Sequence, residues 1–172
     1  MIQEERYMKY ISFAIPCYNS EAYMEKCIDS LLVGGEEVEI LIVDDGSKDG
    51  TTEIADRYQE KYPTIVKAIH QENKGHGGAV NTGVENATGL YFKVVDSDDW
   101  VNPEAYQKIL NVLAEVVRGP KTLDVLISNY VYEKEGAKRK RVMRYAKSLP
   151  EGRFFGWDEA KALGKTHYLL MH

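Results

Sequence analysis

The sequence has few cysteines, no long apolar run and no excess of positive charge, and each shortage argues against a class of protein. The two thiols, Cys17 and Cys27, are not spaced as metal ligands, and a reducing cytoplasm suits them. No apolar run is long enough to cross a bilayer, and residues 1–6 do not form a signal peptide. A net charge of -5 gives no electrostatic reason to expect nucleic acid as a partner.

What the chain does contain is typical of one folded domain. Its 172 residues can form one substantial core and are few for two, and 44% are hydrophobic and 28% charged. Predicted strands alternate with predicted helices, which favours an α/β fold with a mostly parallel, Rossmann-like sheet flanked by helices. The strands are expected at residues 11–15, 38–43, 65–69, 90–95 and 123–127, and a hairpin at 130–132 and 138–144 leads into an irregular C-terminal segment with a helical pattern at 158–163.

Polar clusters follow four of the predicted strands. Because ligands of parallel α/β sheets bind beyond the carboxyl ends of the strands, we expect these clusters to share one rim. That rim would gather an aromatic ring, carboxylates, an amine and glycine amides, which suits a phosphate-bearing ligand held partly through a metal. The clusters are Tyr18-Asn19, Asp44-Asp45, Lys74-Gly75 and Asp96 to Asp99.

The last of these clusters is the most informative. Asp96, Asp98 and Asp99 place three carboxylates within four positions, where they repel one another unless something offsets their charge. Mg²⁺ or Mn²⁺ is the simplest candidate, because both prefer carboxylate oxygens and leave room for phosphate. The alternative is a solvated acidic turn before the helix that Asn102 and Pro103 begin.

The other rim residues each leave two roles open. Asp45 can accept a hydrogen bond from a base N–H, or hold its own turn as an Asx turn. Lys74 can offset diphosphate charge or be solvated, and Gly75 allows a ligand close to the backbone. Tyr18 can stack on a base or pack over the sheet edge. The glycine spacing matches neither the dinucleotide-binding fingerprint nor a P-loop.

Three further features are open in the same way. Trp100 can line a sugar pocket or fill the core, and His76 can touch a ligand or simply face solvent. The basic run Lys138 to Arg141 can meet an anionic acceptor or a membrane surface, or form a solvated hairpin.

Taken together, four ordered blocks resemble the family 2 glycosyltransferases, which have the SpsA-like GT-A fold. The blocks are residues 14–19, 43–51 and 73–83, and Asp96 to Asp99 with Pro103, and their order and spacing fit from about residue 11 to 129. The resemblance implies a metal-dependent transferase that uses a nucleotide-diphospho-sugar donor, UDP-linked, with inversion at the anomeric carbon. It also implies a role in the synthesis of cell-surface polysaccharides or glycoconjugates.

The resemblance also implies roles for single residues. Asp45 would face the uracil, and Asp96 and Ser97 would lie near the ribose or donor sugar. Asp98 would be the main contact of Mn²⁺ or Mg²⁺, with Asp96 and Asp99 as further metal ligands. The residues expected to bind the nucleotide sugar are Pro16, Tyr18, Asn19, Glu21, Asp45, Lys74, Gly75, Asp96 and Ser97.

One part of the family pattern is missing. Inverting transfer needs a base, which the family takes from an acidic motif, and residues 152–172 contain no match to it. Asp158 and Glu159 are the carboxylates there, and we expect them in the first turn of a helix. Residues 1–135 would then form the nucleotide-sugar-binding core and 136–172 the start of a truncated acceptor-side segment, with the base beyond His172. Such a fragment would bind donor but transfer poorly.

The partners expected are a UDP-sugar donor and a saccharide, lipid-linked or polymer acceptor, in the cytoplasm or at the inner face of the membrane. The full-length protein would associate peripherally with that membrane. A sugar nucleotidyltransferase is disfavoured, because residues 16–19 are not a glycine-rich loop with arginine. An aspartyl phosphatase would need its paired aspartates after the first strand. A non-catalytic nucleotide-sugar-binding module stays open.

Overall fold

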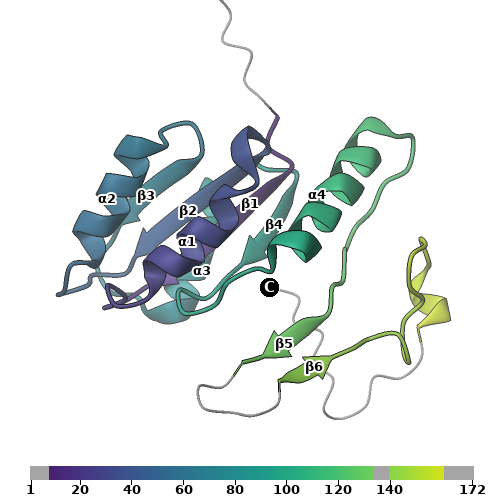
Figure 1. Cartoon of the computed structure of the whole chain (residues 1–172). Helices are drawn as coiled ribbons and strands as arrows, with labels where there is room; N and C mark the ends of the chain where they lie inside the picture. The colour runs from purple at the N-terminus through teal and green to yellow at the C-terminus, as the bar shows by residue number, and fades with distance from the viewer. Residues whose placement is uncertain (1–7, 134–139, 161–172) are drawn as a thin grey trace, which may run out of the picture. The chain divides into compact units, whose positions relative to one another are not determined.

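The computed structural model describes residues 8–133 and 140–160, and the chain divides into two compact units at Gly119. The first unit is built on a parallel sheet in the order β3-β2-β1-β4 (Figure 1). Its strands are β1 (Ile11–Cys17), β2 (Val38–Asp44), β3 (Val66–His70) and β4 (Tyr91–Val94). Its helices are α1 (Met24–Leu32), α2 (Thr51–Lys61), α3 (Gly75–Asn86) and α4 (Pro103–Arg118), with a short 3-10 helix η1 (Gly35–Glu37).

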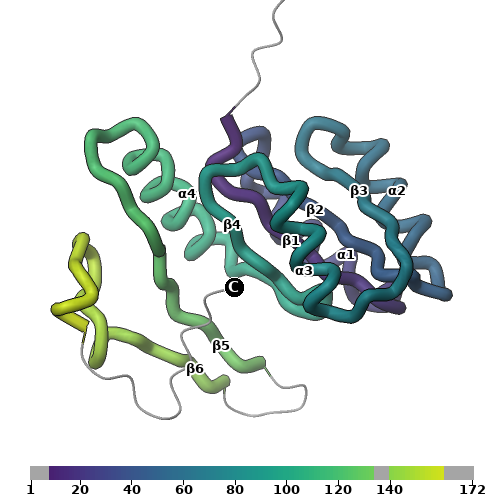
Figure 2. Tube along the Cα trace, turned by 180° about the vertical axis from the view of Figure 1, so that it is seen from behind, coloured from purple at the N-terminus to yellow at the C-terminus, as the bar shows by residue number. Residues whose placement is uncertain are grey.

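The strand order decides which face each helix covers. Right-handed crossovers from β1 to β2 and from β2 to β3 put α1 and α2 on one face. The crossover from β3 to β4 runs back across the sheet, so α3 lies on the opposite face, as Figures 1 and 2 show. Helix α4 shares the face of α1, where the Tyr106 hydroxyl donates to the Leu31 carbonyl at 3.1 Å. The predicted α/β fold with a mostly parallel sheet is confirmed.

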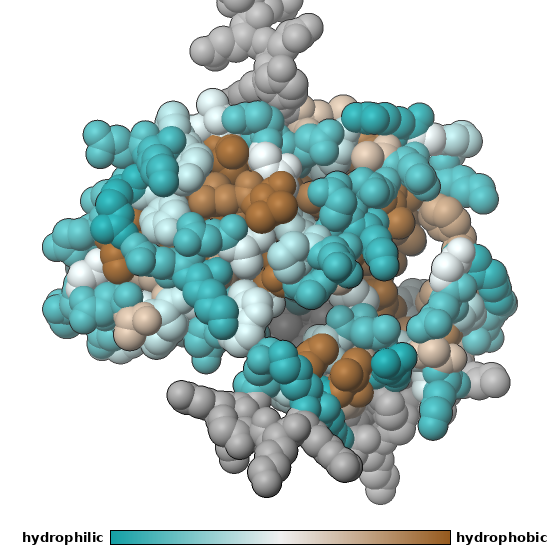
Figure 3. Space-filling view, viewed as in Figure 1, coloured by the Kyte–Doolittle hydropathy of each residue, from teal (hydrophilic) through white to brown (hydrophobic). Residues whose placement is uncertain are grey.

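The core lies along the two central strands, which are covered on both sides. Every residue of β1 is buried, and β2 is buried except at Glu39. Glu39 satisfies its carboxylate locally by accepting hydrogen bonds from the Ser12 hydroxyl at 2.5 Å and the Thr88 amide at 2.8 Å. The surface over the helices is mostly hydrophilic, with limited hydrophobic patches (Figure 3).

The start of α4 follows the sequence signal. The Asn102 side chain accepts a hydrogen bond from the Ala105 amide at 3.0 Å, and Pro103 takes the first helical position, where no amide donor is needed. The helix then buries one stripe of residues, Tyr106, Leu110, Leu113 and Val116.

The first strand was expected to end at residue 15, before Pro16, but β1 continues through Pro16 to Cys17. The Asp45 amide donates to the Cys17 carbonyl on the β2 side, and the Val95 amide donates to the Ala14 carbonyl on the β4 side. Since backbone groups alternate between the two sides, Pro16 faces the β4 side, past the last pair of that ladder, Ala14 with Val94. Its missing donor therefore costs no strand hydrogen bond.

Two other predictions about local structure were wrong. Residues 73–78 are expected to form a glycine-rich loop, but most of them are helical, since α3 begins at Gly75, whose φ of 75° suits glycine. The expected strand at 123–127 is absent, because those residues pair with no strand in the described part of the chain. An apolar run becomes a strand only where a partner edge is available, and sequence alone does not supply that information.

The second unit holds the predicted hairpin. Strand β5 (Tyr130–Tyr132) pairs antiparallel with β6 (Arg141–Met143), and a 3-10 helix η2 (Trp157–Glu159) follows. Residues 134–139 and 161–172, with the expected turn at Glu135-Gly136 and the end of the helical pattern, lie outside the described residues. The second unit begins at Pro120, before the domain boundary predicted at residue 135. The division into a nucleotide-sugar-binding core and an acceptor-side segment stays a prediction. In the described ranges, no helix has the length and apolarity that a bilayer crossing requires.

Candidate functional site

The site lies at the carboxyl ends of the parallel strands. The chain moves from β1 to β2 in one direction and later returns to β4 on the other side of β1, so the topology reverses between β1 and β4. Open α/β sheets bind ligands beyond the strands at such a reversal. Tyr18 and Asn19 follow β1 there, and Asp96 to Asp99 follow β4. The fold therefore gathers polar segments that are far apart in the sequence.

Hydrogen bonds fasten the loop after β1 to the loop after β2. Asn19 donates its amide to the Ser47 hydroxyl at 3.0 Å and accepts from the Lys48 amide at 2.8 Å. Glu21 accepts from the Gly50 amide at 2.6 Å. Asn19 and Glu21, both predicted to bind the nucleotide sugar, thus hold the two loops together.

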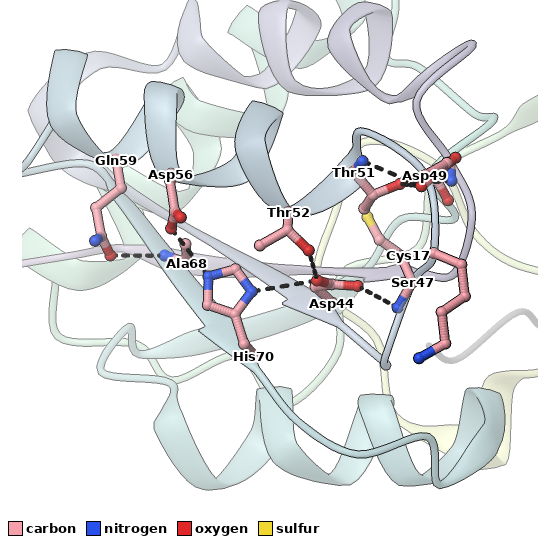
Figure 4. Close-up of polar contacts among 12 residues, drawn as sticks. Cys17, Asp44, Ser47, Asp49, Thr51, Thr52, Asp56, Gln59, Ala68 and His70 are labelled. Atoms are coloured by element: carbon pink, nitrogen blue, oxygen red, sulfur yellow. Dashed lines mark hydrogen bonds and ion pairs between the residues drawn. The ribbon is translucent and has the colours of Figure 1, made fainter.

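Asp44 organises the loop after β2 (Figure 4). Asp44 is 3% exposed, and its carboxylate accepts from the Ser47 amide at 3.0 Å and the Thr52 hydroxyl at 2.6 Å. Burial acts to raise the pKa of Asp44, but these hydrogen bonds outweigh it and lower the pKa. Asp44 therefore takes the turn-holding role that the sequence left open for Asp45.

His70, the last residue of β3, joins Asp44 to helix α2. Its Nδ1 lies 3.2 Å from Asp44 Oδ2, and its Nε2 lies 2.9 Å from Asp56 Oδ1 (Figure 4). Partial burial acts to lower the pKa of His70, but the two carboxylates outweigh it and raise the pKa. In its protonated form, His70 can donate to both carboxylates and so tie β2, β3 and α2 together.

Asp45 is also buried, at 3% exposure, and its two carboxylate oxygens differ. Oδ1 accepts from Gln71 Nε2 at 2.6 Å and from the Lys74 amide at 2.8 Å. Gln71 Oε1 in turn accepts from the Thr82 hydroxyl at 2.5 Å. No hydrogen bond or ion pair reaches Asp45 Oδ2 from the residues that the structure describes.

The acidic segment, Asp96 to Asp99, is held in place at Ser97 and exposed to solvent at Asp98. The buried Ser97 hydroxyl lies 3.0 Å from the Ser20 hydroxyl, which fixes the segment to the loop after β1. Asp96 Oδ1 lies 3.0 Å from His76 Nε2, so exposed His76 faces this carboxylate. The Asp98 carboxylate is exposed and has no hydrogen-bond or ion-pair partner within residues 8–133 and 140–160.

The segment carries more negative charge than its surroundings offset. Partial burial raises the pKa of Asp99, and the charges of Asp98 and Asp96 raise it further. Lys93 opposes that shift, but burial lowers its own pKa. A bound cation would relieve this repulsion.

The three aspartates fit a divalent cation that is shared with a ligand. Over the described residues, no three His, Cys, Asp or Glu side chains are gathered closely enough to hold a metal ion by themselves. Mg²⁺, however, is usually bound through one or two carboxylates together with substrate phosphates and water. Exposed Asp98 and its neighbours supply oxygen ligands of the type that such a shared site needs.

A pocket of about 750 Å³ opens next to the loops after β2 and β3, and its wall includes Gln71, which hydrogen-bonds to Asp45. Tyr18, at 52% exposure, contributes to its wall and so does not pack away over the sheet edge. The wall also contains Gly46, Lys48, His70, Glu72 and Asn73.

Trp100 does not fill the core, which was one of the two roles that the sequence left open. It is 40% exposed, and the Lys26 ammonium lies 3.0 Å from the centroid of its ring. This cation–π contact stabilises a ring that is partly open to solvent.

Two carboxylates of the second unit were expected in a helical turn, and Asp158 and Glu159 do lie in η2. Arg153 pairs with Glu159, hydrogen-bonds to it and lowers its pKa, so Glu159 is poorly suited to accept a proton. In the basic run, Lys140 pairs with Glu133 at 2.6 Å. Arg141 lies in β6, and residues 138–139 lie outside the described part.

Sequence reasoning did not single out His70, Gln71 and Thr82. His70 and Gln71 come at the carboxyl end of a predicted strand, so the rule that placed Tyr18 and Asp45 at the rim would have found them too. Thr82 lies in the block 73–83 that carries the family resemblance, but the sequence gave no sign of its contact with Gln71, because the two residues meet only in the folded chain.

The family model and the relatives that match this chain point to the same protein family. The family model described as glycosyl transferase family 2 matches residues 12–165. The glycosyltransferase EpsH of Bacillus subtilis is 34% identical over 164 residues, which are 87% of this chain and 46% of EpsH. GlyA of Streptococcus pneumoniae is 39% identical over 114 residues, which are 63% of this chain and 16% of GlyA. The chain thus spans less than half the length of these relatives.

Solved structures agree on the fold. The crystal structure of S. aureus TarS 1-349 in complex with UDP has a TM-score of 0.56 and 31% identity, and the match covers 63% of this chain and 33% of TarS. A TarS structure with UDP-GlcNAc is similarly close, with a TM-score of 0.55. The mannosyltransferase PcManGT of Pyrobaculum calidifontis, solved with GDP-Man and Mn²⁺, shares the fold at 24% identity and a TM-score of 0.53.

Proposed function

This chain belongs to glycosyl transferase family 2, and from that membership we propose that it binds the nucleotide-sugar donor of a glycosyl transfer. The proposed donor is a UDP-sugar, and the proposed cofactor is Mn²⁺ or Mg²⁺. For the longer protein of which such a chain is the donor-binding part, the proposed reaction is inverting transfer. The acceptor would be a saccharide, a lipid-linked sugar or a polymer, in cell-surface polysaccharide or glycoconjugate synthesis.

One observation carries the proposal most directly. The topology reverses between β1 and β4, and there the chain presents Asp96, Asp98 and Asp99 with Asp98 unpaired and the pKa of Asp99 raised. These carboxylates would repel an anionic diphosphate, and a cation between them would offset that repulsion. A metal–diphosphate ligand supplies both the missing positive charge and the phosphate oxygens that complete its coordination.

The chain's own residues would divide the work. Oδ2 of Asp45, which receives no hydrogen bond from the described residues, would accept the N3–H of uracil. Tyr18 offers an exposed ring for stacking on the base. Lys74 is exposed beside Asp45 and can lie near the diphosphate. Asn19 and Glu21 keep the loops after β1 and β2 in place while the ligand binds.

The acidic segment would hold the cation. Asp98 is the first ligand proposed, with Asp96 and Asp99 beside it, and Ser97 keeps the segment in position through Ser20. When bound, the cation would supply charge stabilisation for the departing diphosphate. Binding and orientation of the donor are therefore the tasks assigned to this chain.

Two comparisons support the uridine assignment. TarS, 31% identical to this chain over the matched part, has been solved with UDP and with UDP-GlcNAc. The nucleotide base that donates to Asp45 must present an N–H, and uracil does so at N3.

The catalytic base is proposed to lie beyond His172, and the cytoplasmic location stays a prediction.

The experiment is a thermal-unfolding panel. The chain is heated with UDP, UDP-GlcNAc, GDP, CDP or CTP, each with and without Mn²⁺. A ligand that binds the folded state raises the melting temperature by mass action, so UDP and UDP-GlcNAc should do so, and more strongly with Mn²⁺. If no nucleotide changed the melting temperature in either condition, donor binding would be excluded.

A non-catalytic nucleotide-sugar-binding module would give the same melting-temperature shifts in this thermal-unfolding panel. A transfer assay with UDP-sugars and saccharide acceptors separates the two for the chain as it stands, which we expect to turn over slowly or not at all. Full turnover by this chain alone would contradict the placement of the base beyond His172.

A further inference from the structure

We propose that Gln71, held by Thr82, is a positioning residue that leaves one oxygen of Asp45 free for the nucleotide base and so sets the preference among bases. The inference rests on the proposed function, since it concerns how the proposed nucleotide site selects among bases. Nothing in the family comparison assigns a role to either residue.

Gln71 holds Asp44, the last residue of β2, and Asp45, which follows it, at one point each. Its amide donates to the Asp44 carbonyl at 3.0 Å, which extends the pairing of β3 with β2 by one residue. Its side chain donates to Asp45 Oδ1 at 2.6 Å and accepts from the Thr82 hydroxyl at 2.5 Å. Three segments, the loops after β2 and β3 and helix α3, thus meet at one amide group.

The chemistry of the partners fixes the direction of each hydrogen bond. An ionised carboxylate only accepts, so the nitrogen of the Gln71 amide must face Asp45. The amide oxygen then faces Thr82, whose hydroxyl must donate. With the Lys74 amide also donating at 2.8 Å, Oδ1 of Asp45 has two donors and Oδ2 has none from the described residues.

This arrangement determines which base edge Asp45 can recognise. A carboxylate oxygen that is held in place and lacks a donor attracts a base edge with an N–H, such as N3–H of uracil or N1–H of guanine. Cytosine N3 and adenine N1 are acceptors, and each would face Asp45 with a lone pair. If Gln71 released Asp45, the carboxylate could rotate, and the choice between these edges would weaken.

The test uses a change of one atom. Gln71→Glu keeps the shape and the acceptor for Thr82 but replaces the donor to Asp45 with a second carboxylate. At pH 8 we expect UDP affinity to fall about ten- to hundred-fold, as for a lost hydrogen bond to a charged group, while CDP affinity changes little. As the pH is lowered, the two carboxyl groups share a proton, the donor returns, and UDP affinity recovers.

Thr82→Val removes the hydroxyl that orients the amide while keeping the side-chain volume similar, and we expect a smaller fall in the UDP-to-CDP ratio. The matched control is Gln59→Glu, because Gln59 uses its oxygen to accept from the Ala68 amide at 2.8 Å and glutamate still accepts there. That variant should keep the wild-type ratio at every pH.

The measurement is titration calorimetry with UDP and CDP at pH 6 and pH 8, after circular dichroism has established that each variant is folded. Wild-type protein that does not bind UDP would contradict the proposed function itself. Wild-type preference for UDP, with an unchanged ratio in folded Gln71→Glu, would overturn this inference alone. If Gln71→Glu does not fold, an unchanged ratio in Thr82→Val would overturn it equally.

Discussion

Helix α3 lies so close to β1 at Gly83 that a Cβ added there would stand 2.6 Å from the Cβ of Ala14. Both residues are buried, and Ala14 belongs to the central strand. The absence of a side chain at Gly83 therefore sets the distance between the helix and the sheet. Since α3 begins at Gly75 with Lys74 as its N-cap, that distance also places part of the rim.

Gly83→Ala should therefore destabilise the fold. The added methyl group would displace α3 or β1, and we expect the free energy of unfolding to fall by about 1–3 kcal/mol. Gly77→Ala is the matched control in the same helix, because a Cβ there meets nothing within 4 Å. It should leave stability unchanged or raise it by up to about 1 kcal/mol, as alanine suits a helix better. Urea unfolding of both variants measures this, and equal effects would contradict the close contact.

The contribution of His70 to stability should depend on pH. Asp44 on β2 and Asp56 on α2 face its ring and raise its folded pKa, so protonated His70 stabilises the fold. The stabilisation is fully present below the unfolded pKa of about 6.5 and is lost as the pH rises through the raised folded value. Because the His70 side chain is 40% exposed, we expect a pH-dependent part of about 0.5 kcal/mol after screening by solvent.

The comparison of wild-type protein with His70→Gln in urea, from pH 5 to pH 9, measures that difference. The wild-type advantage should shrink as the pH rises. At still lower pH the advantage should shrink again, because Asp44, whose folded pKa is lowered, loses its own contribution as the pH falls through that value. An advantage that stays constant over the whole range would show that the ring does not change charge against these carboxylates.

Asp98→Ala should remove the metal dependence of nucleotide binding. The carboxylate is exposed and unpaired among the described residues, so its loss should cost less than about 0.5 kcal/mol of stability. The melting-temperature gain from UDP with Mn²⁺ should fall to the gain from UDP alone. Asp124→Ala, a substitution in the second unit, is the control. If Asp98→Ala kept the full effect of Mn²⁺, Asp98 would not be a ligand.

Asn19 should tolerate glycine better than alanine. Its φ of 52° is in the left-handed region, which glycine adopts freely and alanine does not. Both variants lose the contact with the Lys48 amide, so the difference between them reports the backbone term alone. We expect Asn19→Ala to be about 1 kcal/mol less stable than Asn19→Gly by urea unfolding. Equal stability would mean that the loop relaxes to another conformation.

Much of the fold could be predicted because its signals are local. Alternating apolar strands and helical stripes predicted β1 to β4, and Asn102 with Pro103 predicted the start of α4. The hairpin of β5 and β6 was predicted as well. The strand expected at 123–127 was wrong, because strand formation depends on a partner edge that only the folded chain provides.

The roles of individual site residues were less accessible. The sequence placed Asp44 and Asp45 in one turn but could not tell which of them holds the turn and which keeps an oxygen free. That difference depends on His70, Gln71 and Thr82, which approach from β3 and α3 after folding. Contacts between residues so far apart leave no pattern in a single sequence.

By itself, then, the sequence determined the order of strands and helices, the family and the segments that reach the rim, because short-range periodicity and motif spacing encode these. The tertiary structure alone decided which side chains meet there, since the parallel strand order brings the ends of β1, β2, β3 and β4 to one edge. Hydrogen bonds across those loops then fix each carboxylate, and their geometry exists only once the sheet has formed.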